Sequence, residues 1–345
     1  MNNVYIIGAK QISVQQPLLE DWMDNPVCYN EPFISAIDPD YKQYFAPNVA
    51  RRLGKILKRA MLTSLQVSKE TEIDNPGAIV MGTGLGCIEN TELFLEPIIF
   101  EGEEMLKPSH FMQSTHNTIA SLIAIDMHCH GYNSTYTQKG ISFECALLDV
   151  FMQLKEKQIQ TALVGAHDEM TPKYFTFLKR IGYLGNAANG FGGETAVSMM
   201  LATNQREKTL CQLGGIEILY RPDKSELKRG LLQVLEQAQC SLDEIDAVMI
   251  GLNNQQANDQ VYAEICTELF PGKKQLCYKH LFGESYSASG LGVYTAATCL
   301  NQQRIPAHLF VDEKEKEQKG VKHILFYNQF ENKNHTFVLL SSCGK

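Results

Sequence analysis

The stretch KHLFGESYSASGLG (residues 279–292) passes from a lysine into a series of serines, an alanine and glycines. It leads directly into the apolar run VYTAATCL (residues 293–300). Small side chains let a backbone approach its neighbours closely. We therefore expect a loop here that enters a helix packed tightly inside the protein.

Outward from this stretch, short β-branched and apolar runs alternate with helical patterns. Continuous apolar runs of this length are typical of strands buried on both faces. Residues 49–67 carry an apolar stripe at helical spacing with a basic opposite face, and residues 144–158 and 226–239 are also predicted helices. This alternation predicts an α/β fold with parallel or mixed sheets. The predicted strands are residues 4–9, 78–84, 161–169, 195–202, 216–220, 247–253, 323–329 and 335–342.

The two sets of strands follow a similar order, and they meet near the charged residues 203–210. We therefore predict two similar halves, residues 1–205 and 206–345, packed into one body. Ser241 and Glu244 form an N-cap with an acid three residues later. The charged run 312–319 is expected to be a solvated loop.

Composition excludes several classes of protein. Of the 345 residues 44% are hydrophobic and 20% charged, which is too apolar for a disordered chain and enough for a large core. The net charge of −8 argues against duplex DNA and anionic membranes as partners. We see no signal peptide, and the longest apolar run, residues 119–125, is far shorter than the roughly 20 residues of a membrane span. The ten cysteines form no CxxC pair, so we expect free thiols in the cytoplasm.

Two short motifs are candidate ligand-binding sites. Gly82, Gly84 and Gly86 follow a predicted strand, but the spacing GxGxG differs from the dinucleotide pattern GxGxxG, and we favour a structural turn. His128, Cys129 and His130 offer potential metal ligands: on a strand the two histidines would share a face. Because no further ligands flank them, we favour a structural role and expect no metal.

Isolated residues are weaker candidates for catalysis. His116 precedes an apolar run and is expected to be a hydrogen-bonded structural histidine. Cys145 lies about one turn inside a predicted helix beside Glu144, and a neighbouring carboxylate raises the pKa of a thiol. We therefore favour a buried structural cysteine over a nucleophile.

Taken together, the segments resemble the β-ketoacyl-acyl-carrier-protein synthases, a family with the thiolase-like fold. The helix ARRLGKILKRAMLTSLQ resembles the family's RMGRLSRLALAAA, and AIVMGTGLGCIENTELFLE resembles GVVVGTGLGGLEETEEFL. ALVGAHDE and GGETA match ALAGGSE and GEGA, and KHLFGESYSASGLG matches KSNIGHTEGAAGVAG almost position for position. The resemblance covers nearly the whole chain and implies two α/β halves in five layers, α-β-α-β-α.

The same resemblance implies that catalysis is lost. The family forms a thioester on a cysteine at a helix start and uses two histidines at the carbonyl of the malonyl group. Its GPNYSVSTAC falls on residues 131–140, which places Gly140 at the nucleophile, or Gln138 after a slip of two residues. Gly251 and Glu284 replace the two histidines, while Lys279 is retained.

The gating loop of the family, NSFGFGG, falls on residues 328–334. The resemblance therefore assigns Phe330 and Asn334 to the wall that gates the acyl pocket. This chain lacks the glycines of the family's gating loop at these positions.

The chain thus resembles chain length factors, the non-condensing subunits that pair with an active synthase in fatty acid or polyketide biosynthesis, here of the aryl-polyene or flexirubin type. The resemblance implies no cofactor, a homodimer or heterodimer through a strand near residues 131–137, and contact with an acyl carrier protein at a basic patch such as the helix face 51–59. The alternative is an acyltransferase with a displaced nucleophile, Cys145 or Cys87, assisted by His116, His167 or Glu284. A third reading, a cofactor-binding α/β protein using residues 82–86, has the least support.

Overall fold

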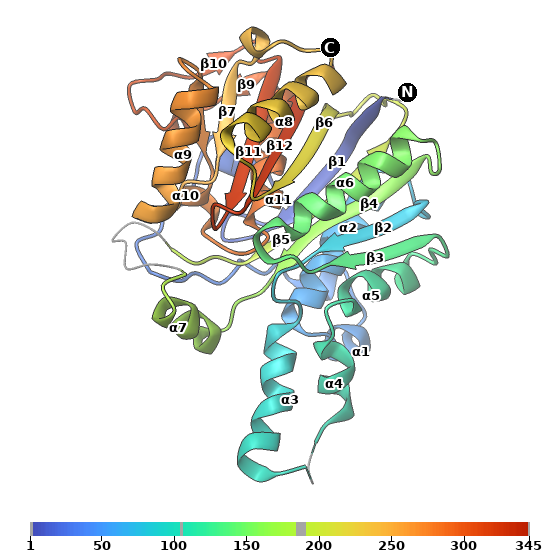
Figure 1. Cartoon of the computed structure of the whole chain (residues 1–345). Coiled ribbons are helices and arrows are strands. Elements are labelled where there is room, and N and C mark those ends of the chain that lie inside the picture. The colour runs from blue at the N-terminus through green and yellow to red at the C-terminus, as the bar shows by residue number, and fades with distance from the viewer. Residues whose placement is uncertain (1–2, 104–105, 184–190, 344–345) are drawn as a thin grey trace.

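A computed structural model describes residues 3–103, 106–183 and 191–343. Ten strands of these residues form one mixed sheet in the order β3-β2-β4-β5-β1-β6-β12-β11-β7-β8, and β9 and β10 form a separate pair (Figure 1). The strands are β1 (Val4–Ile12), β2 (Ala78–Gly82), β3 (Tyr132–Tyr136), β4 (Thr161–Asp168), β5 (Thr195–Ala202), β6 (Cys211–Tyr220), β7 (Ala247–Ile250), β8 (Lys274–Cys277), β9 (Arg304–Ile305), β10 (Gln318–Lys319), β11 (His323–Phe330) and β12 (Asn334–Ser341).

Each half of the chain builds the same five-stranded unit. In the first half, β2 runs parallel to β3 and β4, and β5 runs antiparallel to β4 and β1. In the second half, β7 runs parallel to β8 and β11, and β12 runs antiparallel to β11 and β6. The two units join where β1 pairs with β6, through the pairs Val4–Leu213, Tyr5–Gln212 and Ile6–Cys211.

Helices cover both units and fill the space between them. The helices are α1 (Pro47–Ala50), α2 (Lys55–Thr71), α3 (Ile88–Glu101), α4 (Pro108–Ser114), α5 (Thr118–Asp126), α6 (Ser142–Lys155), α7 (Pro172–Arg180), α8 (Lys224–Gln237), α9 (Gln256–Leu269), α10 (Lys279–Phe282) and α11 (Ala288–Gln302). Helices α2 and α5 pack on the outside of the first unit, α8 and α9 on the outside of the second, and α6 and α11 lie between the units. The predicted five-layered α/β fold is confirmed.

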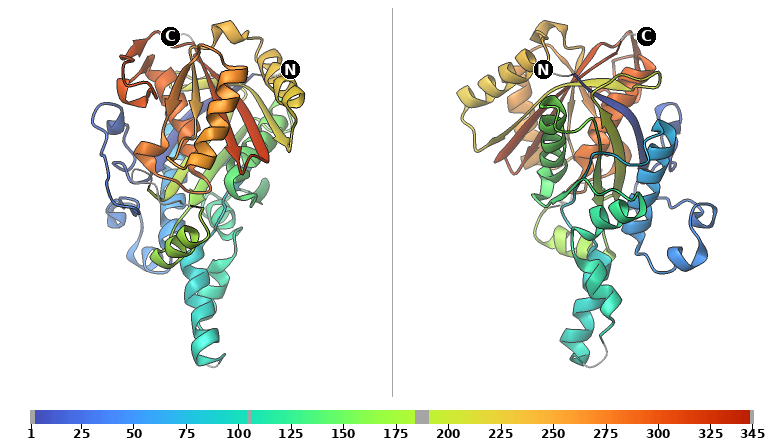
Figure 2. Two further views of the ribbon diagram at one scale, coloured as in Figure 1. Left: turned by 60° about the vertical axis from the view of Figure 1, so that its left-hand side comes forward. Right: turned by 90° about the vertical axis from the view of Figure 1, so that its right-hand side faces the viewer.

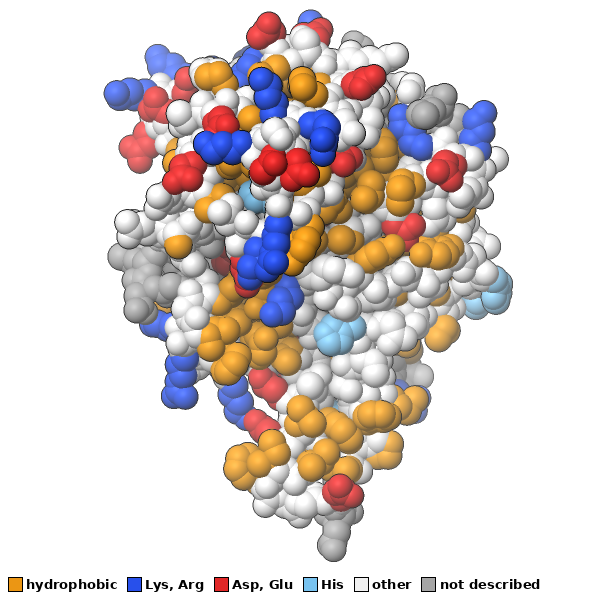
Figure 3. Space-filling view, in the orientation of Figure 1, with side chains coloured by type: hydrophobic (Ala, Val, Ile, Leu, Met, Phe, Trp, Pro, Cys, Tyr) orange, Lys and Arg blue, Asp and Glu red, His pale blue; other side chains and the backbone are white. Residues whose placement is uncertain are grey.

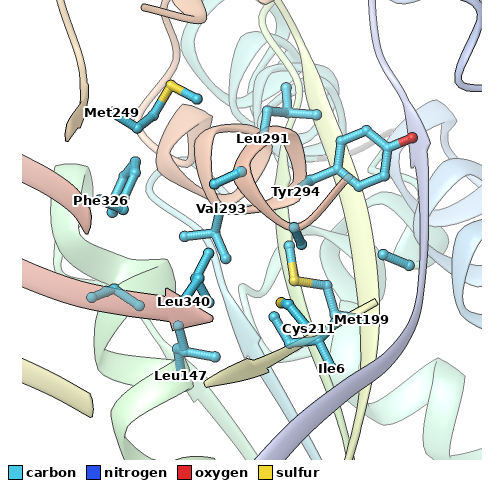
Figure 4. Close-up of a cluster of buried hydrophobic side chains, with 14 of the residues drawn as sticks. Ile6, Leu147, Met199, Cys211, Met249, Leu291, Val293, Tyr294, Phe326 and Leu340 are labelled. Atoms are coloured by element: carbon cyan, nitrogen blue, oxygen red, sulfur yellow. The ribbon is translucent and has the colours of Figure 1, made fainter. Parts of the chain in front are cut away.

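The central layer explains the small residues of 285–292. Every residue of α11 from Ala288 to Leu300 is buried. A Cβ at Gly290 would come within 2.4 Å of Ala166 on β4, and one at Gly292 within 2.5 Å of Phe326 on β11. The helix therefore touches both units at once, and Figure 4 shows Leu291, Val293 and Tyr294 among side chains from both halves.

Some local predictions need correction. The predicted helix 49–67 is broken before Gly54, and α2 begins only at Lys55. Residues 128–130 are not a strand: His128 has a φ of 50°, and β3 begins at Tyr132. The capping box of Ser241 and Glu244 is present, at a short 3-10 helix. The division into residues 1–205 and 206–345 stays a prediction, and it falls in the connection from β5 to β6.

One part of the chain stands away from the body. Helices α3 and α4 form a hairpin that projects from the layered core (Figure 2). Phe94 and Phe111 hold the two helices together, with ring centroids 5.2 Å apart. Within the described part of the chain, no helix has the length and apolar composition needed to cross a membrane.

Candidate functional site

Residues that the resemblance assigns to catalysis meet at one place between the two halves. Gly140 lies in a short 3-10 helix just before α6, and Glu284 lies between α10 and α11. Both line a cavity of about 580 Å³, together with Lys279 and Phe330. Gly251 follows β7 and lies directly beside Lys279. The cavity is therefore built from both halves, as a site at the junction of two α/β units requires.

The nucleophile position has no room for a side chain. A Cβ at Gly140 would come within 2.2 Å of Cδ2 of Phe330. The Phe330 ring is held there by contacts with Tyr286 and Tyr183, at centroid distances of 6.0 and 6.3 Å. Phe330 thus occupies the space in which a thiol at residue 140 would stand.

Two further residues predicted for the site, Asn334 and Gln138, do not line the cavity. Asn334 is the first residue of β12 and pairs with Phe330 in the sheet, away from the cavity wall. Gln138, the alternative position for the nucleophile, is exposed to solvent. Of the two gating residues, only Phe330 reaches the cavity.

The first histidine position is also filled by its neighbours. A Cβ at Gly251 would lie 2.6 Å from the hydroxyl of Tyr262 and 3.3 Å from Nζ of Lys279. An imidazole cannot enter this space unless both side chains move. Tyr262 comes from α9, and no local pattern in the sequence connects it with residue 251.

At the second histidine position, Glu284 forms a buried ion pair. Nζ of Lys279 lies 2.7 Å from Oε2 of Glu284, and Nδ2 of Asn253 donates to the same oxygen at 2.6 Å. Both charged side chains are less than one-tenth exposed. An ionised carboxylate only accepts hydrogen bonds, whereas stabilising a developing oxyanion requires donors. Glu284 therefore cannot replace a histidine that donates to a carbonyl oxygen.

Behind the cavity wall lies a second buried carboxyl group, which sequence reasoning considered only as a neighbour of Cys145. Nδ2 of Asn328 and Oγ of Ser289 donate to Glu144 at 2.5 and 2.9 Å. Asn328 also donates to the carbonyl of Gly140, at 3.2 Å, and accepts from the hydroxyl of Tyr262. Burial raises the pKa of Glu144 to about 7, against the hydrogen bonds that favour the charged form.

Neither alternative nucleophile has an activated thiol. Cys145 lies half-buried on α6, and burial followed by the charge of Glu144 raises its thiol pKa to about 12. Burial also raises the pKa of Cys87, which precedes α3. A reactive cysteine requires the opposite shift. The two thiols are therefore protonated at neutral pH.

The proposed acid–base histidines lie in very different surroundings. His116 is exposed, with its ring packed on Gly86. His167 is fully buried in β4, and burial lowers its pKa to about 3. Among the described residues neither ring nitrogen of His167 has a hydrogen-bond partner.

The glycine loop 82–86 is tied to the chain's own carboxylate. Oδ1 of Asp168 accepts from the backbone N–H groups of Gly84 and Leu85, at 2.9 and 2.8 Å, and from the hydroxyl of Thr83. These N–H groups are the donors that a phosphate would use. The loop is therefore a structural turn closed by Asp168.

Residues 128–130 do not assemble a metal site. The Cys129 thiol donates to the carbonyl of Pro76, while His128 and His130 are exposed. Across the described ranges, no three histidine, cysteine, aspartate or glutamate side chains come together closely enough to hold a metal ion. All ten cysteines are free thiols.

The predicted basic face of residues 51–59 is wrong at its last member. Arg59 is 1% exposed and forms ion pairs with Asp38 and Glu194, at 2.6 and 2.9 Å. Glu194 also accepts from the backbone of Ala36 and Met170. Arg59 therefore anchors the inner side of α2, and the helical spacing alone did not distinguish it from an exposed arginine.

The comparisons with known proteins agree with this fold. Residues 24–256 match the family model described as beta-ketoacyl synthase, N-terminal domain. Because this match covers more than half of the chain, the chain belongs to the β-ketoacyl synthase family. No curated protein sequence matches the chain.

Solved structures share the fold over the full length. A β-ketoacyl synthase from Burkholderia phymatum STM815 superposes with a TM-score of 0.83 at 11% identity, covering 100% of both chains. The ishigamide ketosynthase/chain length factor gives 0.82 at 15% identity, covering 99% of this chain and 100% of the other. A ketosynthase (ApeO) in complex with its chain length factor (ApeC), from Xenorhabdus doucetiae, gives 0.82 at 13%, covering 99% and 98%.

Proposed function

We propose that this chain is a non-condensing member of the β-ketoacyl synthase family that pairs with an active synthase, as a chain length factor does, in fatty acid or polyketide biosynthesis. The observation that carries the proposal is the cavity at the junction of the halves. It is lined by Gly140 and Glu284, with Gly251 beside Lys279, at the positions that the resemblance assigns to catalysis. Each position is closed by a specific neighbour or ion pair. This packing supports the proposal that the chain does not catalyse condensation.

The open edge of the sheet supports a partner. Strand β3 ends the sheet, and an unpaired edge strand is a template for pairing with another chain. Tyr132 on β3 and Ile125 on the adjacent α5 are 44% and 69% exposed. Two of the similar structures are named for a ketosynthase with a chain length factor. We infer that an active synthase binds at this edge.

The projecting hairpin carries a second exposed apolar surface. Ile99, Phe100, Phe111 and Met112 are exposed on α3 and α4. Figure 3 shows hydrophobic side chains gathered on this protrusion. A large exposed apolar patch is typical of a protein interface, so the hairpin is a second candidate contact for the partner.

The finer parts of the proposal concern the pathway and its carrier. Ten free thiols are compatible with a reducing cytoplasm. Arg51 and Arg52, before α2, and Lys55, its first residue, are exposed. An acidic acyl carrier protein would be attracted to them. Aryl-polyene or flexirubin-type pigment synthesis is the pathway that the sequence resemblance favours.

The decisive experiment is affinity purification from the native host, followed by mass spectrometry of the proteins that co-purify. We expect a synthase with an intact cysteine and two histidines. Replacing Ile125 and Tyr132 by glutamate should abolish its recovery, because burying two carboxylates in an apolar interface is unfavourable. Leu232→Glu is the matched control, since Leu232 is similarly exposed on α8, in the other half.

Two results would overturn the proposal. One is a stable homodimer with no synthase recovered by the wild-type chain. The other is an acyl group transferred from acyl-CoA or an acyl carrier protein to Cys145 and absent in Cys145→Ala, which would establish the acyltransferase alternative.

A further inference from the structure

A second cavity, of about 550 Å³, lies beside the first, mainly among residues of the C-terminal half. It is lined by the end of β8, the loop that follows β7, the segment 307–313 and Phe191 of the first half. Pockets that bind small molecules are roughly 300–1,000 Å³ in size. Its volume is therefore sufficient for a ligand.

The ion pair at the family's active-site position forms a wall of this cavity as well. Lys279, Glu284 and Asn253 line both cavities. Because Glu284 already neutralises Lys279 at 2.7 Å, this wall offers a ligand no unpaired positive charge. Glu313, which is exposed, adds a negative charge to the lining of the second cavity.

Three titratable side chains of the second cavity are uncharged at neutral pH. Burial raises the pKa of the Cys277 thiol to about 12 and lowers the pKa of His280 to about 4. Burial also lowers the pKa of His308. Sγ of Cys277 lies 3.3 Å from Nδ1 of His280. With a protonated thiol and a neutral ring, the thiol donates, Nδ1 accepts and the ring proton is on Nε2.

The remaining lining is largely apolar. Phe191, Leu252, Phe310 and Val311 contribute aromatic and aliphatic surface. A cavity with this surface, a few polar groups and several shifted pKa values has the features of a binding site. Its chemistry determines the kind of ligand that it can accept.

We propose that the second cavity binds an uncharged molecule with an apolar body and one hydrogen-bonding end, such as a short acyl amide or ester. The apolar body lies against Phe191, Phe310 and Val311, and the polar end faces the imidazole and thiol groups. A charged ligand would lose its hydration without gaining an unpaired opposite charge from the buried wall. An anion would in addition be repelled by Glu313.

The test uses three probes with the same six-carbon chain and different charge: hexanamide, hexanoate and hexylammonium. Calorimetric titration of the free wild-type chain should show hexanamide binding at least tenfold more tightly than the two ions. Failure of hexanamide to bind overturns the proposal. Equal or tighter binding of either ion overturns it too.

Two matched variants locate the site. Ala307 lines the second cavity and Ala257 lines the first, and both are exposed, so a tryptophan at either position is compatible with folding. Ala307→Trp should weaken hexanamide binding at least tenfold and Ala257→Trp should leave it unchanged. The reverse pattern would overturn the assignment. Because these measurements use the free chain, their failure would leave the proposed partnership with a synthase untouched.

Discussion

The two halves of the molecule have the same strand order and orientation, but the outermost strand is open in the first half and covered in the second. In the first half β3 ends the sheet with its edge open. In the second half a chain segment covers β8: the N–H of Val311 donates to the carbonyl of Gln275 at 2.9 Å, and Leu276 forms a bridge with Phe310. The outer edge of the five-stranded unit is thus covered in the second half and open in the first. The proposed partner would pair at the β3 edge.

The largest expected effect tests this difference between the edges. Phe310→Ala should lower the free energy of unfolding by about 3–5 kcal/mol, because it removes a buried aromatic ring from the cover of β8. Tyr132→Ala, on the open edge, should change it by less than about 1 kcal/mol in the free chain. Urea unfolding of both variants measures the difference. Equal losses would show that the edge of β3 is not open in solution.

The next effect concerns Glu144, through which the first half contacts Ser289 and Asn328 of the second. Its pKa is raised from 4.5 to about 7, so the folded protein holds the proton more tightly than the unfolded chain. The resulting stabilisation is complete below about pH 4.5 and is lost as the pH rises through 7. At about 1.4 kcal/mol per pKa unit, the loss is roughly 3 kcal/mol.

Glu144→Gln isolates this contribution from the histidines, whose lowered pKa values act in the opposite direction. Between pH 5 and pH 8 the variant should gain roughly 2–3 kcal/mol of unfolding free energy relative to the wild type. Glu156→Gln, at the exposed end of the same helix, should follow the wild type at every pH. Parallel curves for the wild type and Glu144→Gln would contradict the prediction.

A smaller effect tests the contact between Gly140, just before α6 in the first half, and Phe330, at the end of β11 in the second. Gly140→Cys should destabilise the protein by about 1–3 kcal/mol, because the new side chain overlaps Phe330. Phe330→Ala should recover part of this loss, with a coupling energy of about 0.5–3 kcal/mol in a double-mutant cycle. Strict additivity of the two substitutions would mean that Phe330 does not close the nucleophile position.

The smallest expected effect concerns the N-terminal caps of two outer helices, α8 and α2. Helix α8 begins with a capping box formed by Asp223 and Glu226, whereas α2 has Gly54 as its N-cap residue and therefore no side-chain cap. Asp223→Ala should lower the free energy of unfolding by about 1 kcal/mol. Lys228→Ala, at an exposed position of the same helix, should stay within about 0.5 kcal/mol. If the two variants unfold alike, the capping box contributes nothing to stability.

Much of the fold could be predicted because most strands are buried on both faces. The run at 195–202 matches β5 residue for residue. In contrast, β8 was missed because its sequence KQLC contains no continuous apolar run, and β3, with the sequence YNSTY, was expected only from the family resemblance. Short strands at an edge carry less apolar signal, because fewer of their side chains are buried.

Site residues in segments that resemble the family could be predicted from the sequence. Residues that reach the site only through tertiary contacts could not. Matching the sequence to the family's motifs identified Gly140, Glu284 and Lys279, and the structure places all three around one cavity. The residues that close the site, Tyr262 and Asn328, come from α9 and β11. Their roles depend on contacts over dozens of residues, which no local spacing records.

The pairing of β1 has a consequence for synthesis on the ribosome. Residues 5–12 pair with residues 196–202, so the first strand is made almost two hundred residues before its partner. At about 5–20 residues per second, this strand waits roughly 10–40 s. During that time its apolar side chains have no sheet to join. Helix α2, which packs on β1 and is made soon after it, can cover one face of the strand until β5 emerges.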